Sequence, residues 1–107
     1  METEVKLIKD NASTLYVSHP HASYGVFCFN SSGDLFLKSD WGTYGYAWRA
    51  YDDDFVKFIA QTNSDYIVGK FSINYTELTT KKLPKFREEK IVLLREELIK
   101  YCKEISK

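Results

Sequence analysis

The chain has 107 residues, a formal net charge of zero and an aromatic content of 16%. This length predicts one domain over residues 1–107, large enough to bury a core without disulfides or metals. The aromatic content excludes a disordered chain, and the low counts of five glycines and two prolines exclude a low-complexity or fibrous protein.

The charge is distributed unevenly along the sequence. Residues 1–80 contain six Lys or Arg and ten Asp or Glu, a balance of −4, whereas residues 81–107 contain nine and five, a balance of +4. The acidic part argues against a general nucleic-acid coat. The basic end still allows a local contact with phosphates or with an acidic protein.

The first half of the sequence predicts β-structure, because short apolar and aromatic segments alternate with turn residues. Residues 23–29 are apolar on both faces, which predicts a central strand. Gly42 lies in a tight turn and is expected to have a positive φ. The expected strands cover residues 5–9, 14–18, 23–29, 35–39 and 43–49.

The second half predicts helices. Phe55, Phe58 and Ile59 lie at i, i+3 and i+4, and a second short helix is expected from residue 64 or 65 through 71. A polar connection over residues 72–82 leads to a long helix over residues 84–105. The expected fold class is α+β: an antiparallel meander sheet of about five strands, two short helices and a long C-terminal helix packed on one face.

The last predicted helix carries an apolar stripe with spacings of three and four residues: Ile91, Leu94, Leu98, Tyr101 and Ile105. A helix that covers one sheet face is the favoured interpretation. The same spacing is found in coiled coils, so a seam that joins a homodimer through this helix is the alternative.

Tyr44, Tyr46 and Trp48 lie two residues apart, so a strand would place all three rings on one face. This platform is either one wall of the core or a binding surface, and core packing is favoured for most of its rings. Base stacking would require interleaved basic residues, of which Arg49 is one of few nearby. Trp41, in a turn, is expected to be the most exposed ring.

Acidic residues surround the platform: Asp34, Asp40, Asp52, Asp53 and Asp54. The triple aspartate could bind a metal ion, but consecutive residues do not converge on one ion. Capping of the following helix is favoured, because carboxylates accept hydrogen bonds from the free N–H groups of a first turn.

Basic residues cluster at the start of the last predicted helix: Lys81, Lys82, Lys85 and Arg87. Cations are unfavourable at this end of the helix dipole, so local stability does not explain them. A solvated linker is the commoner explanation, and a contact with phosphates or acidic side chains is the functional alternative.

Catalytic and metal-binding signatures are not found in the sequence. His19 and His21 flank Pro20 in an expected solvated loop, and no third ligand follows at a diagnostic spacing. Cys28 and Cys102 are expected to be buried, reduced thiols. We therefore expect a protein that is not an enzyme and that has no cofactor and no metal.

Targeting signals and membrane spans are also not recognised. The first residues contain no apolar signal region, and no apolar run approaches the ~18 residues that a membrane span needs. The sequence therefore predicts a cytoplasmic protein without a membrane partner.

The central segment resembles small accessory proteins of bacteriophages and prophages. The shared patterns are SDWGxYxYxWR at residues 39–49, FxxFI at residues 55–59 and DYxxGKF at residues 65–71. The resemblance covers residues 34–71 and implies a phage origin and the cytoplasm of a host cell. Small non-enzymatic phage proteins often inhibit host defence, and anti-CRISPR proteins are the best-known group.

The resemblance implies an inhibitor that binds a host defence protein, such as a CRISPR–Cas effector. It would act by steric blocking or by acidic mimicry of nucleic acid, with the aspartates facing a basic channel. The expected binding surface comprises Asp34, Asp40, Trp41, Tyr44, Tyr46, Trp48, Arg49, Asp52, Asp53 and Asp54.

Two alternatives remain open at this point. One is a small nucleic-acid-binding module that uses Lys81, Lys82, Lys85 and Arg87 with an exposed tryptophan. The other is a homodimeric structural protein joined through the C-terminal helix.

Overall fold

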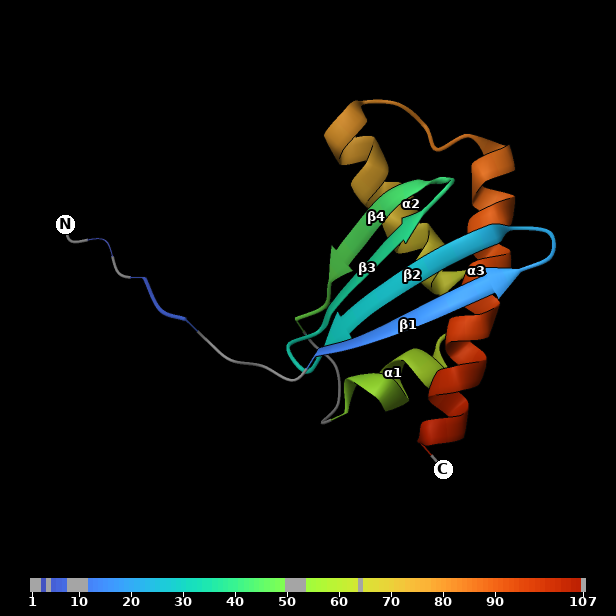
Figure 1. Cartoon of the computed structure of the whole chain (residues 1–107). Coiled ribbons are helices and arrows are strands. Elements are labelled where there is room, and N and C mark those ends of the chain that lie inside the picture. Colours follow the sequence, from blue (N-terminus) through green and yellow to red (C-terminus); the bar gives the residue numbers. More distant parts are fainter. Residues whose placement is uncertain (1–2, 4, 8–11, 50–53, 64, 107) are drawn as a thin grey trace.

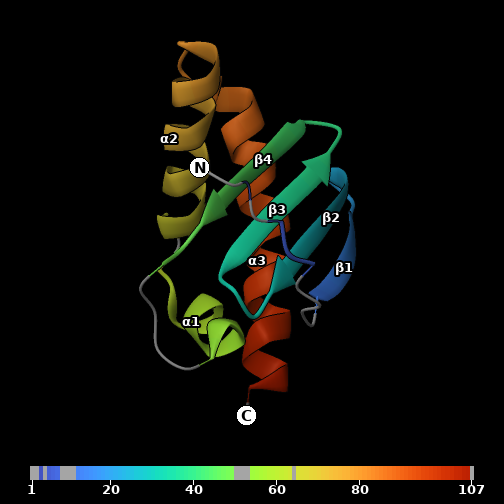
Figure 2. The same cartoon turned by 90° about the vertical axis from the view of Figure 1, so that its left-hand side faces the viewer.

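The structure of the chain is a computed structural model that describes residues 3, 5–7, 12–49, 54–63 and 65–106. Within these residues the strands form one antiparallel sheet, and each strand pairs with the next one along the chain. Helices α2 and α3 lie behind one face of the sheet, and α1 packs on α3 (Figures 1 and 2). The elements are β1 (Ala12–His19), β2 (Ser23–Asn30), β3 (Asp34–Ser39), β4 (Gly42–Ala47), α1 (Phe55–Gln61), α2 (Tyr66–Thr79) and α3 (Lys85–Ile105).

Two glycines make the tight connections of the sheet. Gly33 has a φ of 89° and Gly42 a φ of 116°, a backbone region that residues with a side chain rarely adopt. The positive φ predicted for Gly42 is therefore confirmed. Asn30 stabilises the β2–β3 turn, because its side-chain carbonyl accepts hydrogen bonds of 3.0 Å from the backbone N–H groups of Ser32 and Asp34.

The core lies between the inner face of the sheet and the helices. Alternate residues of a strand point to opposite faces, so Phe27, Leu35 and Leu37 all point toward the helices and are fully buried. Phe71 of α2 and Leu98 of α3 meet them from the helical layer and are also fully buried.

Helix α3 lies close to the sheet at Gly25 of β2. A Cβ atom on Gly25 would lie only 2.9 Å from Cδ1 of Leu94 and 3.1 Å from Cδ1 of Leu37. Glycine at this position therefore lets the buried side chain of Leu94 rest directly on the backbone of the central strand.

The strand predictions are confirmed in part. The described residues contain four strands instead of about five. Residues 5–7 form no strand, and the side chains of Val5 and Leu7 are each 87% exposed, while residues 8 and 9 lie outside the described part of the chain. An alternating pattern is therefore not sufficient for a strand, which also needs a neighbour for its backbone and a surface for its side chains.

The central position predicted for residues 23–29 is confirmed, because β2 pairs with β1 on one side and β3 on the other. The strand expected over residues 43–49 ends earlier, at Ala47. The backbone N–H of Trp48 instead donates a 2.8 Å hydrogen bond to the carbonyl of Gly33 in the β2–β3 turn.

The second helix is longer than predicted, so the polar connection expected over residues 72–82 is wrong. Helix α2 continues through Thr79 because Tyr75 packs against Tyr44 of β4, with ring centroids 6.0 Å apart. It ends where Thr80 adopts a left-handed conformation with φ 60°. The long last helix was predicted within one residue, and Pro84 caps it instead of forming its first turn.

Candidate protein-binding surface

The aromatic platform expected from the sequence forms a wall of the core. Tyr44 and Trp48 are only 4% and 6% exposed, and Tyr46 is half-buried. The indole N–H of Trp48 donates a 3.0 Å hydrogen bond to the hydroxyl of Tyr66 on α2. The favoured interpretation of core packing is thus confirmed, and these rings are not a free binding surface.

Trp41 is half-buried, so the expectation that it is the most exposed ring is wrong. Its indole N–H donates a 2.8 Å hydrogen bond to the carbonyl of Ala22 in the β1–β2 connection. The ammonium of Lys90 lies 5.4 Å from the centre of its ring, and that ammonium also donates a 2.6 Å hydrogen bond to the carbonyl of His21. Trp41 therefore joins the two hairpins to α3.

Arg87 is the one residue of the predicted basic cluster that reaches the platform. It lies beside the hydroxyl of Tyr44, which donates a hydrogen bond to the carbonyl of Trp41. Burial raises the pKa of Tyr44, while the hydrogen bond and the charge of Arg87 act in the opposite direction. The guanidinium of Arg87 is therefore engaged within the fold.

The exposed aromatic surface lies on the opposite side of the sheet, toward the viewer in Figure 1. The register places its residues side by side, since Tyr16 pairs with Val26 and Cys28 pairs with Phe36. Tyr16 is 64% exposed and Phe36 51% exposed. We call this band the outer sheet face and define it as Tyr16, Tyr24, Val26, Cys28 and Phe36.

Contacts within the outer sheet face hold its rings in place. The rings of Tyr16 and Tyr24 stack with centroids 6.2 Å apart. Phe36 lies over the backbone of Gly45, where a Cβ atom would come within 2.5 Å of its ring. Because Gly45 has no side chain, the exposed ring of Phe36 can lie directly against its backbone.

The sequence interpretation missed the outer sheet face, although one signal for it was present. Phe36 stands between Leu35 and Leu37, and residues 24–29 contain no charged side chain and place apolar or aromatic residues on both faces. A strand that is apolar on both sides has a second apolar face even when helices cover only one side. In the sequence, this pattern was interpreted only as the sign of a central strand.

The acidic residues do not form one patch in the described part of the chain. Asp34 accepts a 3.0 Å hydrogen bond from the side chain of Asn30, and Asp40 accepts one of 2.7 Å from Ser23. These two aspartates lie at opposite ends of β3, roughly 20 Å apart at about 3.3 Å per residue.

The triple aspartate is described only at its last residue. Asp54 caps α1, because its carboxylate accepts hydrogen bonds from the backbone N–H groups of Val56 at 2.9 Å and Lys57 at 3.3 Å. The capping prediction is confirmed for this residue. Asp52 and Asp53 lie outside the described residues, and Arg49 is exposed.

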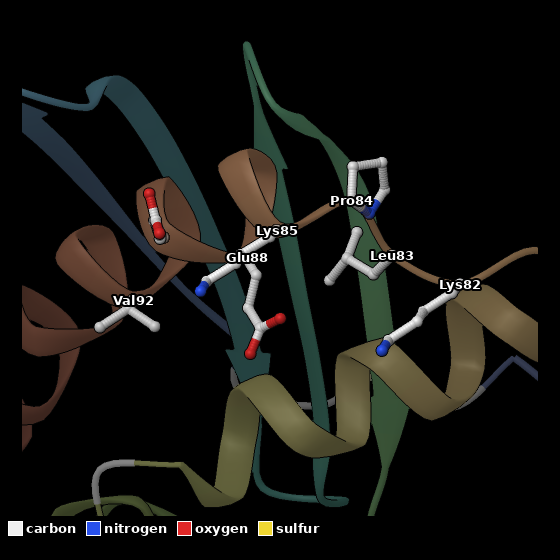
Figure 3. Close-up of a pocket in the computed structure, with 7 residues that line it drawn as sticks. Lys82, Leu83, Pro84, Lys85, Glu88 and Val92 are labelled. Atoms are coloured by element: carbon white, nitrogen blue, oxygen red, sulfur yellow. The ribbon is translucent and has the colours of Figure 1, made fainter.

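Two of the other basic residues, Lys82 and Lys85, line a groove of about 420 Å³ formed by the α2–α3 connection and the first turns of α3. In Figure 3 the side chains of Lys82 and Glu88 both extend toward α2. Lys85 and Glu89 also line this groove, and Lys81 is exposed nearby. Because carboxylates share the groove with the lysines, its charge is mixed and not purely basic.

Both cysteines are described and both are free thiols. Cys102 is fully buried as expected, whereas Cys28 is exposed on the outer sheet face, so the prediction of burial is wrong for Cys28. Burial raises the pKa of Cys102 to about 12, and the carboxylate of Asp54 adds to this effect. Only Cys28 is therefore accessible for thiol chemistry.

Arg95 of α3 is a charged side chain inside the fold, with an exposed fraction of only 3%. Its Nε has no hydrogen-bond partner among the described residues. Burial lowers its pKa, and the nearby carboxylates of Glu96 and Asp65 oppose that effect. Among the described residues, no group of three or more His, Cys, Asp or Glu side chains could hold a metal ion.

The fold and this surface define a small α+β protein with an exposed aromatic sheet face. A family model named Phage_phiTE_072, described as a phage family, matches residues 5–107. The chain therefore belongs to this phage family, which confirms the phage origin that its central segment implied. Searches of curated proteins and of solved structures found no match to it. Among the described helices, none has both the length and the apolar character to cross a membrane.

Proposed function

We propose that this phage protein is a non-enzymatic inhibitor that binds a host defence protein, such as a CRISPR–Cas effector, and blocks it sterically. The observation that carries the proposal is the outer sheet face. It presents Tyr16 and Phe36, which are 64% and 51% exposed, on a paired and regular sheet. Tyrosine is enriched among the residues that dominate binding energies, and rigid rings lose little entropy on binding.

The size of the face fits a protein partner. The whole sheet, with four strands about 4.8 Å apart and six to eight residues long, spans roughly 450 Å². A standard interface buries about 800 Å² on each partner, so the outer sheet face would supply its centre and neighbouring loops its rim.

Steric blocking is favoured over acidic mimicry. Mimicry of nucleic acid requires closely spaced negative charges that face a basic channel. Asp34 and Asp40 are far apart and engaged in hydrogen bonds, and Asp54 is used as a helix cap. The described aspartates therefore support local structure.

The alternative of a nucleic-acid-binding module rests on the groove along the α2–α3 connection and the start of α3. Lys82 and Lys85 line it, and Phe86 beside them is 57% exposed and could stack on a base. The carboxylates of Glu88 and Glu89 on the same groove weaken this function, because they would repel phosphates.

The test starts with an affinity pull-down of the tagged protein from host lysate, with and without nuclease, read by mass spectrometry. The captured protein is then purified, and its affinity is measured for the wild type, Phe36→Ala and Phe86→Ala. Phe86 is the matched control, since it is an equally exposed phenylalanine on α3. We expect Phe36→Ala to weaken binding at least 30-fold, about 2 kcal/mol, and Phe86→Ala to leave it unchanged.

Other results would contradict the proposal. Capture that disappears with nuclease, together with a DNA affinity that falls steeply with salt and depends on Lys82, would support the nucleic-acid module. Equal binding by Phe36→Ala and the wild type would exclude the outer sheet face as the contact. Thermal melting of each variant shows that a lost interaction is not lost folding.

A further inference from the structure

Among the described residues, no strand pairs with the outer edge of β1. Strand β1 pairs only with β2 among the described residues, so the backbone groups along its other side are available for pairing (Figures 1 and 2). Edge strands are usually protected by charged residues, proline or a bulge. The β1 sequence ASTLYVSH contains no Lys, Arg, Asp, Glu or Pro, and it pairs with β2 one to one over all eight residues.

The opposite edge of the sheet is less suited to pairing. Strand β4 has only six residues, two of which are Gly42 and Gly45. Short edge strands and glycines discourage the addition of another strand. The two edges are therefore not equivalent.

A groove of about 390 Å³ runs along the β1 edge. Four consecutive residues, 15–18, line one of its sides. Since alternate residues point to opposite faces, a groove lined by consecutive residues must follow the edge of the strand. The groove is therefore placed where an added strand would lie.

Helix α3 forms the other side of this groove through Glu97, Lys100, Tyr101 and Glu104. Their spacing puts them on one helical face. Lys100 lies between the two glutamates. In an inverted copy of this stripe, Lys100 of each chain faces a glutamate of the other when the two-fold axis passes between Lys100 and one glutamate. Lys100 is 74% exposed, and its 3.4 Å contact with Glu97 within the chain leaves its ammonium accessible to a second copy.

We infer that a second copy of this chain docks here around a two-fold axis. The β1 strands of the two copies pair antiparallel and join the sheets, and the C-terminal halves of α3 lie alongside each other with Lys100 facing a glutamate of the other copy. Tyr101 and Ile105, which are 39% and 49% exposed, add apolar surface at this contact. This arrangement uses the last helix, as the sequence alternative did, and adds the strand edge.

The size of the contact agrees with a specific dimer. Two antiparallel strands of eight residues can form about eight main-chain hydrogen bonds, within the range of about 10 ± 5 in a typical interface. The pairing joins the two sheets into one continuous sheet and leaves both outer sheet faces exposed. The dimer can therefore form whether or not the proposed target is bound.

The experiment is sedimentation equilibrium over a wide range of concentrations. We expect the wild type to form a species with twice the mass of the 12.5 kDa chain. Lys100→Glu makes the stripe uniformly negative and should raise the dimer dissociation constant at least tenfold. Lys103→Glu, an exposed α3 lysine outside the groove, is the matched control and should dimerise normally.

A charge-swap mixture tests the geometry. The double variant Glu97→Lys, Glu104→Lys should also dimerise weakly, and mixing it with Lys100→Glu should restore a heterodimer. Amide hydrogen exchange within β1 should slow as protein concentration rises, because new hydrogen bonds protect its outer N–H groups.

Two outcomes would overturn the inference. One is a strict monomer at millimolar concentration. The other is a dimer that resists Lys100→Glu and shows no concentration-dependent protection of β1. Thermal melting of the variants shows whether they fold, and restored association in the charge-swap mixture cannot come from misfolded chains. A monomer that still binds its target would leave the proposed function intact.

Discussion

The contact between Gly25 and Leu94 predicts a measurable coupling between the central strand and the last helix. Leu94 is fully buried, and Cδ1 of its side chain occupies the space that a Cβ atom on Gly25 would approach to 2.9 Å. Leu94→Ala empties this space, while Gly25→Ala overfills it. The double variant replaces one methyl group by another and should recover part of the loss.

The magnitudes follow from the burial. Leu94→Ala removes about three buried carbon groups, which costs about 2.4 kcal/mol at ~0.8 kcal/mol each. Each 50 Å³ of void that remains would add about 1.2 kcal/mol, and Gly25 has no side chain with which to fill it. We therefore expect a total loss of about 3–4 kcal/mol, against a stability of about 5–15 kcal/mol for a domain.

Gly25→Ala alone should be nearly neutral or destabilising by up to about 1 kcal/mol. The gain in strand propensity of about 0.5–1 kcal/mol is offset by overpacking against two methyl groups. In the Leu94→Ala background the same change should stabilise by about 1 kcal/mol, because the new methyl group enters the void.

Urea unfolding of the four proteins, followed by circular dichroism, measures the coupling energy of this double-mutant cycle. We expect a favourable coupling of about 1–2 kcal/mol. Additive effects within 0.3 kcal/mol would refute the close approach of α3 to β2. Leu98→Ala is the control background, since the three atoms nearest to a Cβ on Gly25 belong to Leu94 and Leu37, and the two changes should add.

Three further predictions concern single residues. An aromatic disulfide reagent should modify Cys28 rapidly in the native protein and Cys102 only on unfolding. Burial raises the pKa of Cys102 from about 9.0 to about 12, so the neutral thiol stabilises the fold below pH 9. Relative to Cys102→Ala, this stability should be lost as the pH rises from 9 toward 12, by up to ~1.4 kcal/mol per pH unit. Equal reaction rates of both thiols would contradict this. Arg95→Met should raise the free energy of unfolding by about 1–2 kcal/mol, because it removes a buried charge whose Nε is unpaired among the described residues. A lower free energy of unfolding in denaturant melts would instead show that the guanidinium makes contacts that stabilise the fold. Asp54→Ala should lower the free energy of unfolding by about 0.5–2 kcal/mol, and Asp54→Asn should lower it less, since Asp54 caps α1. An unchanged melting temperature would contradict a stabilising role of this cap.

Local patterns were sufficient to find most of the elements. Turn residues and glycines marked the hairpins, and the positive φ of Gly42 was predicted because only glycine adopts it without strain. The spacing of Leu94, Leu98 and Tyr101 predicted the long helix within one residue. The resemblance of residues 39–49 to phage proteins agrees with the family to which the chain belongs.

Other features depended on contacts that no local pattern contains. Helix α2 runs through Thr79 because Tyr75 meets Tyr44 across the fold, although the sequence of this segment is polar. The segment at residues 5–7 alternates like a strand but has no neighbour in the described structure. Tertiary packing overrides weak local propensity in both cases.

The sequence by itself determined the fold class, the phage resemblance and the presence of an aromatic sheet. It favoured burial of the Tyr44 and Trp48 face but did not reveal the exposed aromatic face, because β2 is apolar on both faces and Phe36 of β3 lies opposite Leu35 and Leu37. Packing of α2 and α3 buried Tyr44 and Trp48 and left Tyr16 and Phe36 exposed. The candidate surface was therefore decided by tertiary structure, since burial is a property of the neighbours that a side chain meets.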